Sequence, residues 1–318
     1  MAQILNSVIG HKNIISRLKS VITSGHIGSC YLFCGPSGIG KKKVAIGFIQ
    51  QVLCSVNKKG EPACGECAQC IKVERGEHEE VLQISPEGTQ IKIQQAEEIH
   101  RFLNLQKIGE HRFIVINEAQ LLNPQAGNSL LKILEEPPAE TTFFLIAPSD
   151  RAVLKTLRSR SQIIYFSSLT LEDLRKHTDL PDWILLSSQG RMDLLEQLKD
   201  ASLNEIRQKS FDVLRTALQS HFKNAITDLK EILGDKENAL KLIALWQQIF
   251  RDILLYKDNL QPQIHSDQTQ VMASFQNVSS EKIHMLFEKL LQIERDIYGN
   301  VDRTLAFENF ILDLRNNP

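Results

Sequence analysis

Residues 35–42 read Gly-Pro-Ser-Gly-Ile-Gly-Lys-Lys and lie between a short apolar stretch and a helical pattern. This is the order of a phosphate-binding loop, in which backbone N–H groups at a helix N-terminus face phosphate oxygens and a lysine reaches the terminal phosphates. Gly35, Gly38, Gly40 and Lys41 are therefore the candidate nucleotide-binding residues. The pattern indicates descent from a P-loop protein, which by itself does not establish ATP hydrolysis.

The two positions that would hold Mg²⁺ in such a site carry unsuitable residues. The last loop position, normally Ser or Thr, is Lys42, whose side chain has no oxygen. The Asp expected after the apolar stretch 113–116 is Asn117, followed by Glu118. Asparagine keeps one oxygen but lacks the negative charge that a hard divalent cation favours. We predict an inactive or severely impaired site with doubtful ATP binding, and a slow ATPase that tolerates both residues is the alternative.

Four of the six cysteines follow the spacing C-x9-C-x2-C-x2-C, at Cys54, Cys64, Cys67 and Cys70. Four thiolates at such spacing suit a tetrahedral Zn²⁺ ion, and four protein ligands leave no open position for catalysis. We therefore predict a structural zinc site. Iron–sulfur or redox chemistry and unligated thiols are the alternatives. The other two cysteines, at 30 and 34, fit small core residues.

Five short apolar stretches separated by helical patterns position these residues. Such alternation predicts a parallel sheet covered on both faces. The predicted strands are 31–34, 81–84, 113–116, 142–146 and 163–166.

After residue 166 the strand pattern stops and helical patterns continue to the end of the chain. We predict an α/β P-loop domain with its zinc module over 1–167, a small helical domain over 168–202, and an all-α domain over 203–318.

Composition limits the classes of partner and compartment. The net charge of −1 gives no overall basic character, so contact with DNA would need a local basic patch. Arg101, Lys107 and Arg112 are weighed as such a patch, with scattered basic residues on exposed faces as the commoner case. No apolar run is long enough to span a membrane, and the N-terminus lacks the form of a signal peptide, so we expect a cytoplasmic protein.

Four segments together resemble the AAA+ clamp-loader family of bacterial DNA polymerase III, in its delta prime branch. They are Val-Ile-Gly-His at 8–11, Asn-Ser-Leu-Leu-Lys-Ile-Leu-Glu-Glu-Pro-Pro at 128–138, Thr-Leu-Arg-Ser-Arg-Ser-Gln at 156–162, and Asn-Val-Asp-Arg-Thr-Leu-Ala-Phe-Glu at 300–308. The third looks like the family's Ser-Arg-Cys motif, with Ser161 in place of the cysteine. The resemblance spans nearly the whole chain.

The resemblance implies a five-subunit ring that opens a sliding clamp and places it on primed DNA, with residues 168–202 as a lid domain and residues 203–318 as the ring-assembly domain. In such rings a neighbour inserts an arginine into each ATP site, and by the motif match Arg160 would be that arginine finger. Active relatives carry an arginine three residues after a glycine of the lid, whereas this chain has Asp193 there and Arg191 is offset by two. The expected function is a non-hydrolysing subunit that works with gamma/tau and delta subunits. An active ATPase motor subunit of gamma/tau type is the alternative.

Overall fold

The computed structural model describes residues 3–57, 60–200, 202–219, 222–299 and 301–315. Residue 300, which begins the fourth resembling segment, and residues 316–318 lie outside the described residues. The chain forms two compact units, residues 1–179 with 189–194, and residues 180–188 with 195–318. Residues 168–202, predicted from sequence as a lid, are divided between the two units.

The first unit is built on a five-stranded parallel sheet with the strand order β2-β3-β4-β1-β5. Its strands are β1 (Cys30–Cys34), β2 (Val81–Ile84), β3 (Arg112–Ile116), β4 (Thr141–Ala147) and β5 (Gln162–Tyr165). Every position of β1, β3 and β4 is buried, as expected for strands covered on both faces. The five predicted strands are confirmed, each within one residue of its observed ends.

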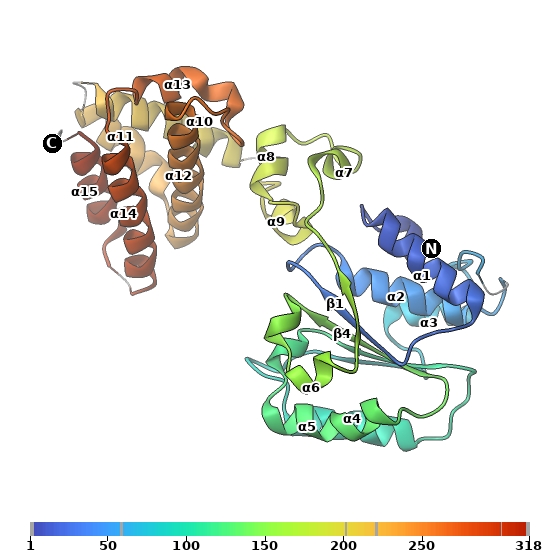
Figure 1. Cartoon of the computed structure of the whole chain (residues 1–318). Coiled ribbons are helices and arrows are strands. Elements are labelled where there is room, and N and C mark those ends of the chain that lie inside the picture. The colour runs from blue at the N-terminus through green and yellow to red at the C-terminus, as the bar shows by residue number, and fades with distance from the viewer. Residues whose placement is uncertain (1–2, 58–59, 201, 220–221, 300, 316–318) are drawn as a thin grey trace. The chain divides into compact units, whose positions relative to one another are not determined.

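Helices cover both faces of this sheet (Figure 1). One face carries α1 (Lys12–Ser24), α2 (Lys41–Leu53) and α3 (Ala68–Arg75), and the other carries α4 (Ile93–Asn104), α5 (Pro124–Glu135) and α6 (Lys155–Arg158). Each face has its own apolar core. Phe33, Phe48 and Phe144 pack as edge-to-face rings in the first core, and Leu130 and Leu145 belong to the second.

Side-chain caps explain where two of the helices, α5 and α7 (Leu171–Arg175), begin. Asn123 caps α5 by accepting from the N–H of Ala126 at 2.7 Å, and Pro124 occupies the first helical position. Thr170 and Asp173 form a capping box at the start of α7. The remaining short elements are η1 (Ile4–Ser7), η2 (Ala119–Leu121), η3 (Asp150–Ala152), α8 (Asp182–Ser187) and α9 (Met192–Gln197).

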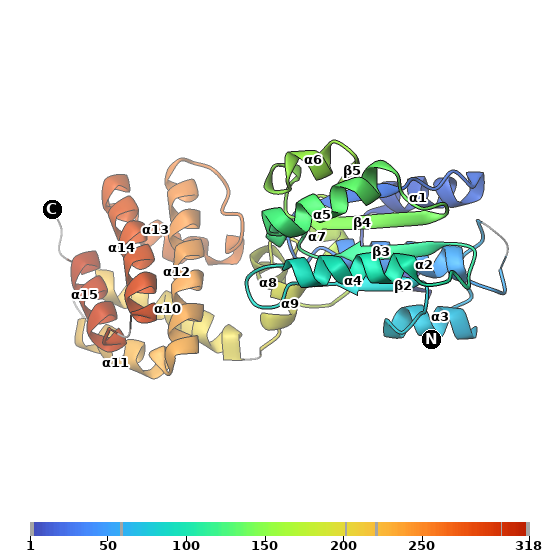
Figure 2. The same ribbon diagram turned by 90° about the horizontal axis from the view of Figure 1, so that it is seen from below.

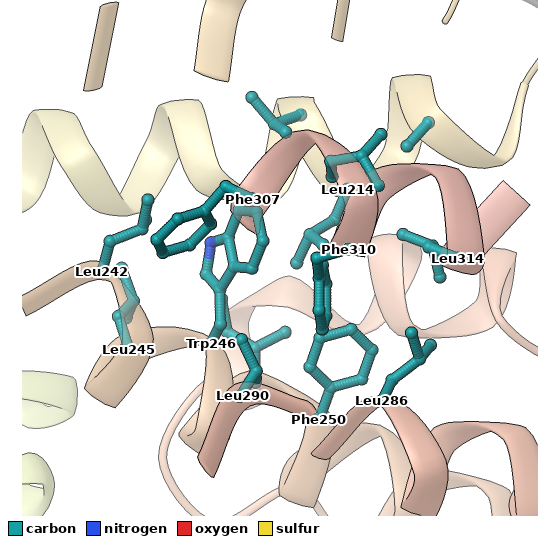
Figure 3. Close-up of a cluster of buried hydrophobic side chains, with 14 of the residues drawn as sticks. Leu214, Leu242, Leu245, Trp246, Phe250, Leu286, Leu290, Phe307, Phe310 and Leu314 are labelled. Carbon is teal, nitrogen blue, oxygen red and sulfur yellow. The ribbon is translucent and has the colours of Figure 1, made fainter. Parts of the chain in front are cut away.

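The second unit is helical, as predicted for this part of the chain. Besides α8 it contains α10 (Ser202–Leu218), α11 (Phe222–Leu233), α12 (Lys236–Lys257), η4 (Ser266–Gln268), α13 (Thr269–Ser274), α14 (Ser280–Tyr298) and α15 (Arg303–Arg315), which Figure 2 shows from a second side. Trp246 of α12 lies at the centre of its core, against Phe307 and Phe310 of α15 (Figure 3). Among the described residues no helix is long and apolar enough to cross a membrane.

A buried polar cluster fixes the loop between α12 and η4. The carboxylate of Asp252 accepts backbone N–H groups from Gln263, Ile264 and His265 at 3.2, 2.8 and 2.7 Å. Arg207 Nε donates to His265 Nδ1 at 3.2 Å, so this imidazole is an acceptor in a fully buried position. Burial, aided by the Arg207 charge, lowers the pKa of His265 to about 4. This histidine is therefore neutral in the folded protein at neutral pH.

Candidate functional site

The predicted phosphate loop connects the end of β1 to the start of α2, which is the arrangement that a P-loop requires. Gly35 approaches the neighbouring chain closely, because an added Cβ would lie 2.3 Å from the carbonyl oxygen of Phe166. Gly38 and Gly40 have positive φ angles of 71° and 95°, a region that glycine adopts without strain. The loop thus has glycine at two positions with positive φ and at one where the neighbouring backbone leaves no room for a side chain.

Lys41 is turned towards its own loop. Its Nζ donates to the carbonyl oxygen of Gly35 at 2.6 Å and to that of Pro36. Burial lowers the pKa of Lys41 below its usual value. The next residue, Lys42, is exposed, so the position that would supply a hydroxyl to Mg²⁺ presents an ammonium instead.

A pocket of about 1190 Å³ brings together the predicted residues Gly38, Gly40 and Lys41, whereas Gly35 does not line it. The loop residues 37–43 line it, as do Asn117 and Glu118 from the end of β3 and Asp193 from α9. Asn117 is held by its backbone, whose N–H donates to the carbonyl oxygen of Ile84 at 2.8 Å, and Glu118 is exposed with a φ of 56°. The described lining therefore offers the carboxylates of Glu118 and Asp193 and the amide of Asn117 near the phosphate loop.

Asp193 lies against the loop itself. A Cβ built on Gly38 would be 1.6 Å from Asp193 Oδ1, so this carboxylate occupies the side of the glycine where other residues carry a side chain. Arg191 donates two hydrogen bonds to the same carboxylate, from Nε at 3.2 Å and from Nη2 at 2.7 Å. These hydrogen bonds lower the pKa of Asp193, which is ionised at neutral pH.

Arg160 follows α6, on a short turn that leads into β5. Its Nη1 donates to the carbonyl oxygen of Thr156 at 3.0 Å, and its Nη2 pairs with Glu135 at the end of α5. The side chain is 31% exposed, which leaves part of the guanidinium open to solvent. Ser161, which replaces the motif's cysteine, anchors the turn through its hydroxyl to the carbonyl oxygen of Leu157 at 2.8 Å.

The four predicted cysteines lie together beside α2 and α3. Their sulfur atoms all fall within 4.8 Å of one another, close enough to share one metal ion. Cys54 is the C-cap of α2, and Cys67 is the N-cap of α3, where its sulfur accepts the N–H of Cys70 at 3.5 Å. Backbone N–H groups also point at Cys64 Sγ, from Glu66 at 3.5 Å and from Cys67 at 3.3 Å.

This environment favours the thiolate form at two positions of the cluster, because hydrogen bonds outweigh burial and lower the pKa of Cys54 and of Cys67, whereas burial raises the pKa of Cys70. Burial opposes ionisation of Cys67, but hydrogen bonds with Ser55 and Cys70 outweigh it and lower the pKa of Cys67 to about 6. A cluster of four sulfurs with donors aimed at them fits a soft cation of the zinc class. Cys30 and Cys34 are buried in the sheet, as expected for core residues.

The burial of Arg112 excludes it from a DNA-binding basic patch with Arg101 and Lys107. Its side chain is 5% exposed and pairs with the carboxylate of Glu80, Nε to Oε2 at 2.6 Å. A buried and paired guanidinium does not meet DNA. The sequence could not reveal this, because the pairing partner lies 32 residues away.

Sequence reasoning missed two further contacts of the site. The ion pair of Arg160 with Glu135 could not be predicted, because the two residues lie 25 positions apart in two different sequence motifs. The N–H of Met192 donates to the carbonyl oxygen of Gly38 at 2.8 Å. The spacing from Gly190 identifies Asp193 as the position of an absent arginine, but it does not predict the contact of Asp193 with the loop.

Comparisons with known proteins cover both parts of the chain. The family model described as DNA polymerase III, delta subunit, matches residues 10–170, and that described as DNA polymerase III, delta subunit, C terminal, matches residues 201–316. The DNA polymerase III subunit tau of Bacillus subtilis is 27% identical over 289 residues, covering 80% of this chain and 50% of that protein. Subunit delta' of the same organism is 23% identical over 328 residues and covers 95% of both chains.

Among solved structures, a DNA polymerase III gamma subunit-related protein of Thermotoga maritima matches with a TM-score of 0.50 and 21% identity. It covers 95% of this chain and 98% of that chain, which supports the fold. The chain spans half or less of the length of several relatives, the tau subunit of Bacillus subtilis among them. Because the first model alone matches half of the residues, the chain belongs to the DNA polymerase III delta-subunit family, in agreement with the clamp-loader resemblance of its sequence.

Proposed function

We propose that this chain is a non-hydrolysing, stator-like subunit of the DNA polymerase III clamp loader. It helps to load the sliding clamp onto primed DNA and supplies Arg160 in trans to the ATP site of a neighbouring subunit. Its partners are then gamma/tau and delta subunits, the clamp and primed DNA, in the cytoplasm. Residues 168–202 act as a lid and residues 203–318 as the ring-assembly domain.

The composition of the phosphate pocket carries the proposal. Lys42 and Asn117 stand where Mg²⁺ would be held, and Asp193 stands where active relatives carry an arginine. Without the metal, the charge that builds on a transferring γ-phosphoryl group is left without its main counter-charge. Arg160, by contrast, keeps a guanidinium partly open to solvent on a well-anchored turn.

The cysteine cluster is proposed to hold a structural zinc ion. Cys54, Cys64, Cys67 and Cys70 supply four sulfur ligands, and the ion would join the end of α2 to the start of α3. Its contribution is to the stability of the first unit, with no role in the chemistry of ATP.

An ATPase motor of gamma/tau type is the second candidate. The similarity to tau subunits favours it, as do the retained Lys41 and the carboxylate of Glu118 at the pocket. This candidate requires that the purified chain hydrolyse ATP in the presence of Mg²⁺ and lose that activity in Lys41→Ala.

The arginine assignment is tested in a reconstituted ring. Arg160→Ala should lower DNA-stimulated ATP turnover, because removing an arginine finger slows the site that it serves by about 10³-fold or more. Arg160→Lys should rescue little, because an ammonium lacks the planar fork of donors. Turnover is measured per ring at saturating ATP.

Arg151→Ala is the matched control, since this arginine is exposed and lies on η3, in the same connection between β4 and β5 as Arg160. It should leave turnover unchanged, and all three variants should melt within about 2 °C of the parent chain, as surface substitutions usually do. Unchanged turnover in rings that contain Arg160→Ala would remove the arginine-finger role.

A further inference from the structure

The phosphate loop is held by its own chain as well as by its lysine. The N–H of Met192 donates to the carbonyl oxygen of Gly38 at 2.8 Å, and His11 Nε2 lies 2.9 Å from the carbonyl oxygen of Ile39. Residues 189–194 belong to the same compact unit as the loop. The loop is therefore fixed by hydrogen bonds from two distant parts of the sequence.

The carboxylate of Asp193 covers one side of this loop. Its Oδ1 and Cγ lie 1.6 and 2.3 Å from the position of a Cβ on Gly38, so the carboxylate is in direct contact with the glycine. The two donors of Arg191 hold it there, and such a forked contact fixes direction as well as distance. The Arg191 charge is consequently engaged by Asp193.

This arrangement opposes a bound nucleotide in two ways. A phosphate chain in the loop would meet a like charge at contact distance, where Coulomb repulsion is largest. The loop's own cation is also engaged, because Lys41 Nζ donates to the carbonyl oxygens of Gly35 and Pro36. A nucleotide would have to displace the Asp193 carboxylate and break its contact with Arg191 before phosphates could take their place.

We propose that Asp193 determines the ligand specificity of this loop, because its carboxylate, held by Arg191, covers Gly38 and excludes the phosphates of ATP and ADP. The inference rests on the proposed non-hydrolysing function and names the residue that would exclude the nucleotide. The contacts of Met192 and Asp193 with Gly38 would also hold residues 189–194 against the loop, whatever the nucleotide state of neighbouring subunits.

The test uses the full chain and two variants, with ATP in the presence of Mg²⁺ as the calorimetric probe. Asp193→Asn removes the charge and keeps a side chain of the same size, and Asp193→Ala also removes the cover. The dissociation constant for ATP should fall by at least about tenfold in the Asn variant and further in the Ala variant. Asp179→Asn, an exposed carboxylate of the same unit, is the matched control and should bind like the parent.

Hydrogen exchange of the Met192 amide gives a second readout. In the parent chain this N–H should exchange slowly without nucleotide, and Asp193→Ala should speed its exchange. Failure of both folded Asp193 variants to bind ATP would overturn the inference and leave the non-hydrolysing function standing. Binding by the parent as tight as by the variants would also overturn it, and ATP turnover by that parent would overturn the proposed function as well.

Discussion

Glu80 and Arg112 fix the loop before β3 through a single buried ion pair. Glu80 accepts the N–H groups of Ile108 and Gly109, the latter at 3.0 Å, while Arg112 Nη1 donates to the carbonyl oxygen of Phe102 at 2.9 Å. Both side chains are almost fully buried, at 2% and 5% exposure. Removing one partner leaves the other charged and buried, which costs more than the pair contributes.

Arg112→Met should therefore destabilise the first unit by about 3–5 kcal/mol. Urea denaturation at pH 7 measures the loss, and Arg101→Met is the control because that arginine is exposed. A loss below about 1 kcal/mol, the range of a surface pair, would show that the pair is solvated in solution.

The same pair gives the first unit a pH dependence of known sign. Burial alone would raise the pKa of Glu80, but hydrogen bonds from Arg112 and from the N–H groups of Gly109 and Ile108 hold it below its ordinary value. Its stabilisation is thus present above the unfolded pKa of about 4.3 and is lost as the pH falls through the lower folded value. The denaturation midpoint of Arg112→Met should lack this acid loss.

At the scale of elements, α2 joins two of the features described above. Its first residue, Lys41, belongs to the phosphate loop, and its C-cap, Cys54, belongs to the cysteine cluster. Val44, Phe48 and Ile49 bury the helix between these ends in the core of one sheet face. A metal at the cysteines would therefore also fix the far end of the helix that presents the loop.

Cys67→Ser should lower the zinc content of the purified chain and the melting temperature of the first unit. Serine is a good N-cap, so α3 keeps its cap and the change isolates metal ligation. A loss of about 2 kcal/mol would lower the melting temperature by about 4–8 °C for a unit of this size. Atomic emission gives the metal content, and a chelator should then cause no further shift in the variant. A metal-free parent that melts at the same temperature would contradict the proposed zinc.

Some of the elements and contacts are predictable from the sequence and others are not. The strands were predictable because buried parallel strands are continuous apolar runs, as in Phe113–Ile116. The cysteine cluster was predictable because its spacing is local. The contact of Asp193 with Gly38 was not, because it joins positions 155 residues apart in sequence and depends on the path of the chain between them. The same holds for the pairing of Glu80 with Arg112.

The molecule as a whole has separate cores in its two units. His265 provides a means of identifying the second unit in an unfolding experiment. Because its folded pKa of about 4 lies below the ordinary value, the unfolded chain takes up a proton first as the pH falls. Stability of the second unit is then lost from about pH 6.5 downwards, by about 2 kcal/mol at pH 5.

His265→Asn should abolish this loss between pH 7 and 5, because an asparagine oxygen can replace the Nδ1 acceptor for Arg207 without titrating. Scanning calorimetry at the two pH values measures it, with the exposed His284→Asn as control. A chelator should move the transition of the first unit only. One transition that responds equally to pH, His265→Asn and chelator would contradict the independence of the two cores.

Two glycines of the phosphate loop are required by the packing around them, whether or not the loop binds a nucleotide. Gly35 has no room for a side chain beside the backbone of Phe166, and Gly38 has none beside Asp193. Selection for folding alone would thus retain both glycines after the loss of any enzymatic use. If the proposed function holds, a genome survey that identifies ATPases from this glycine pattern alone would also count proteins that no longer hydrolyse ATP. Under the proposed function, the residues that distinguish such a descendant are Lys42, Asn117 and Asp193, which line the same pocket as the loop.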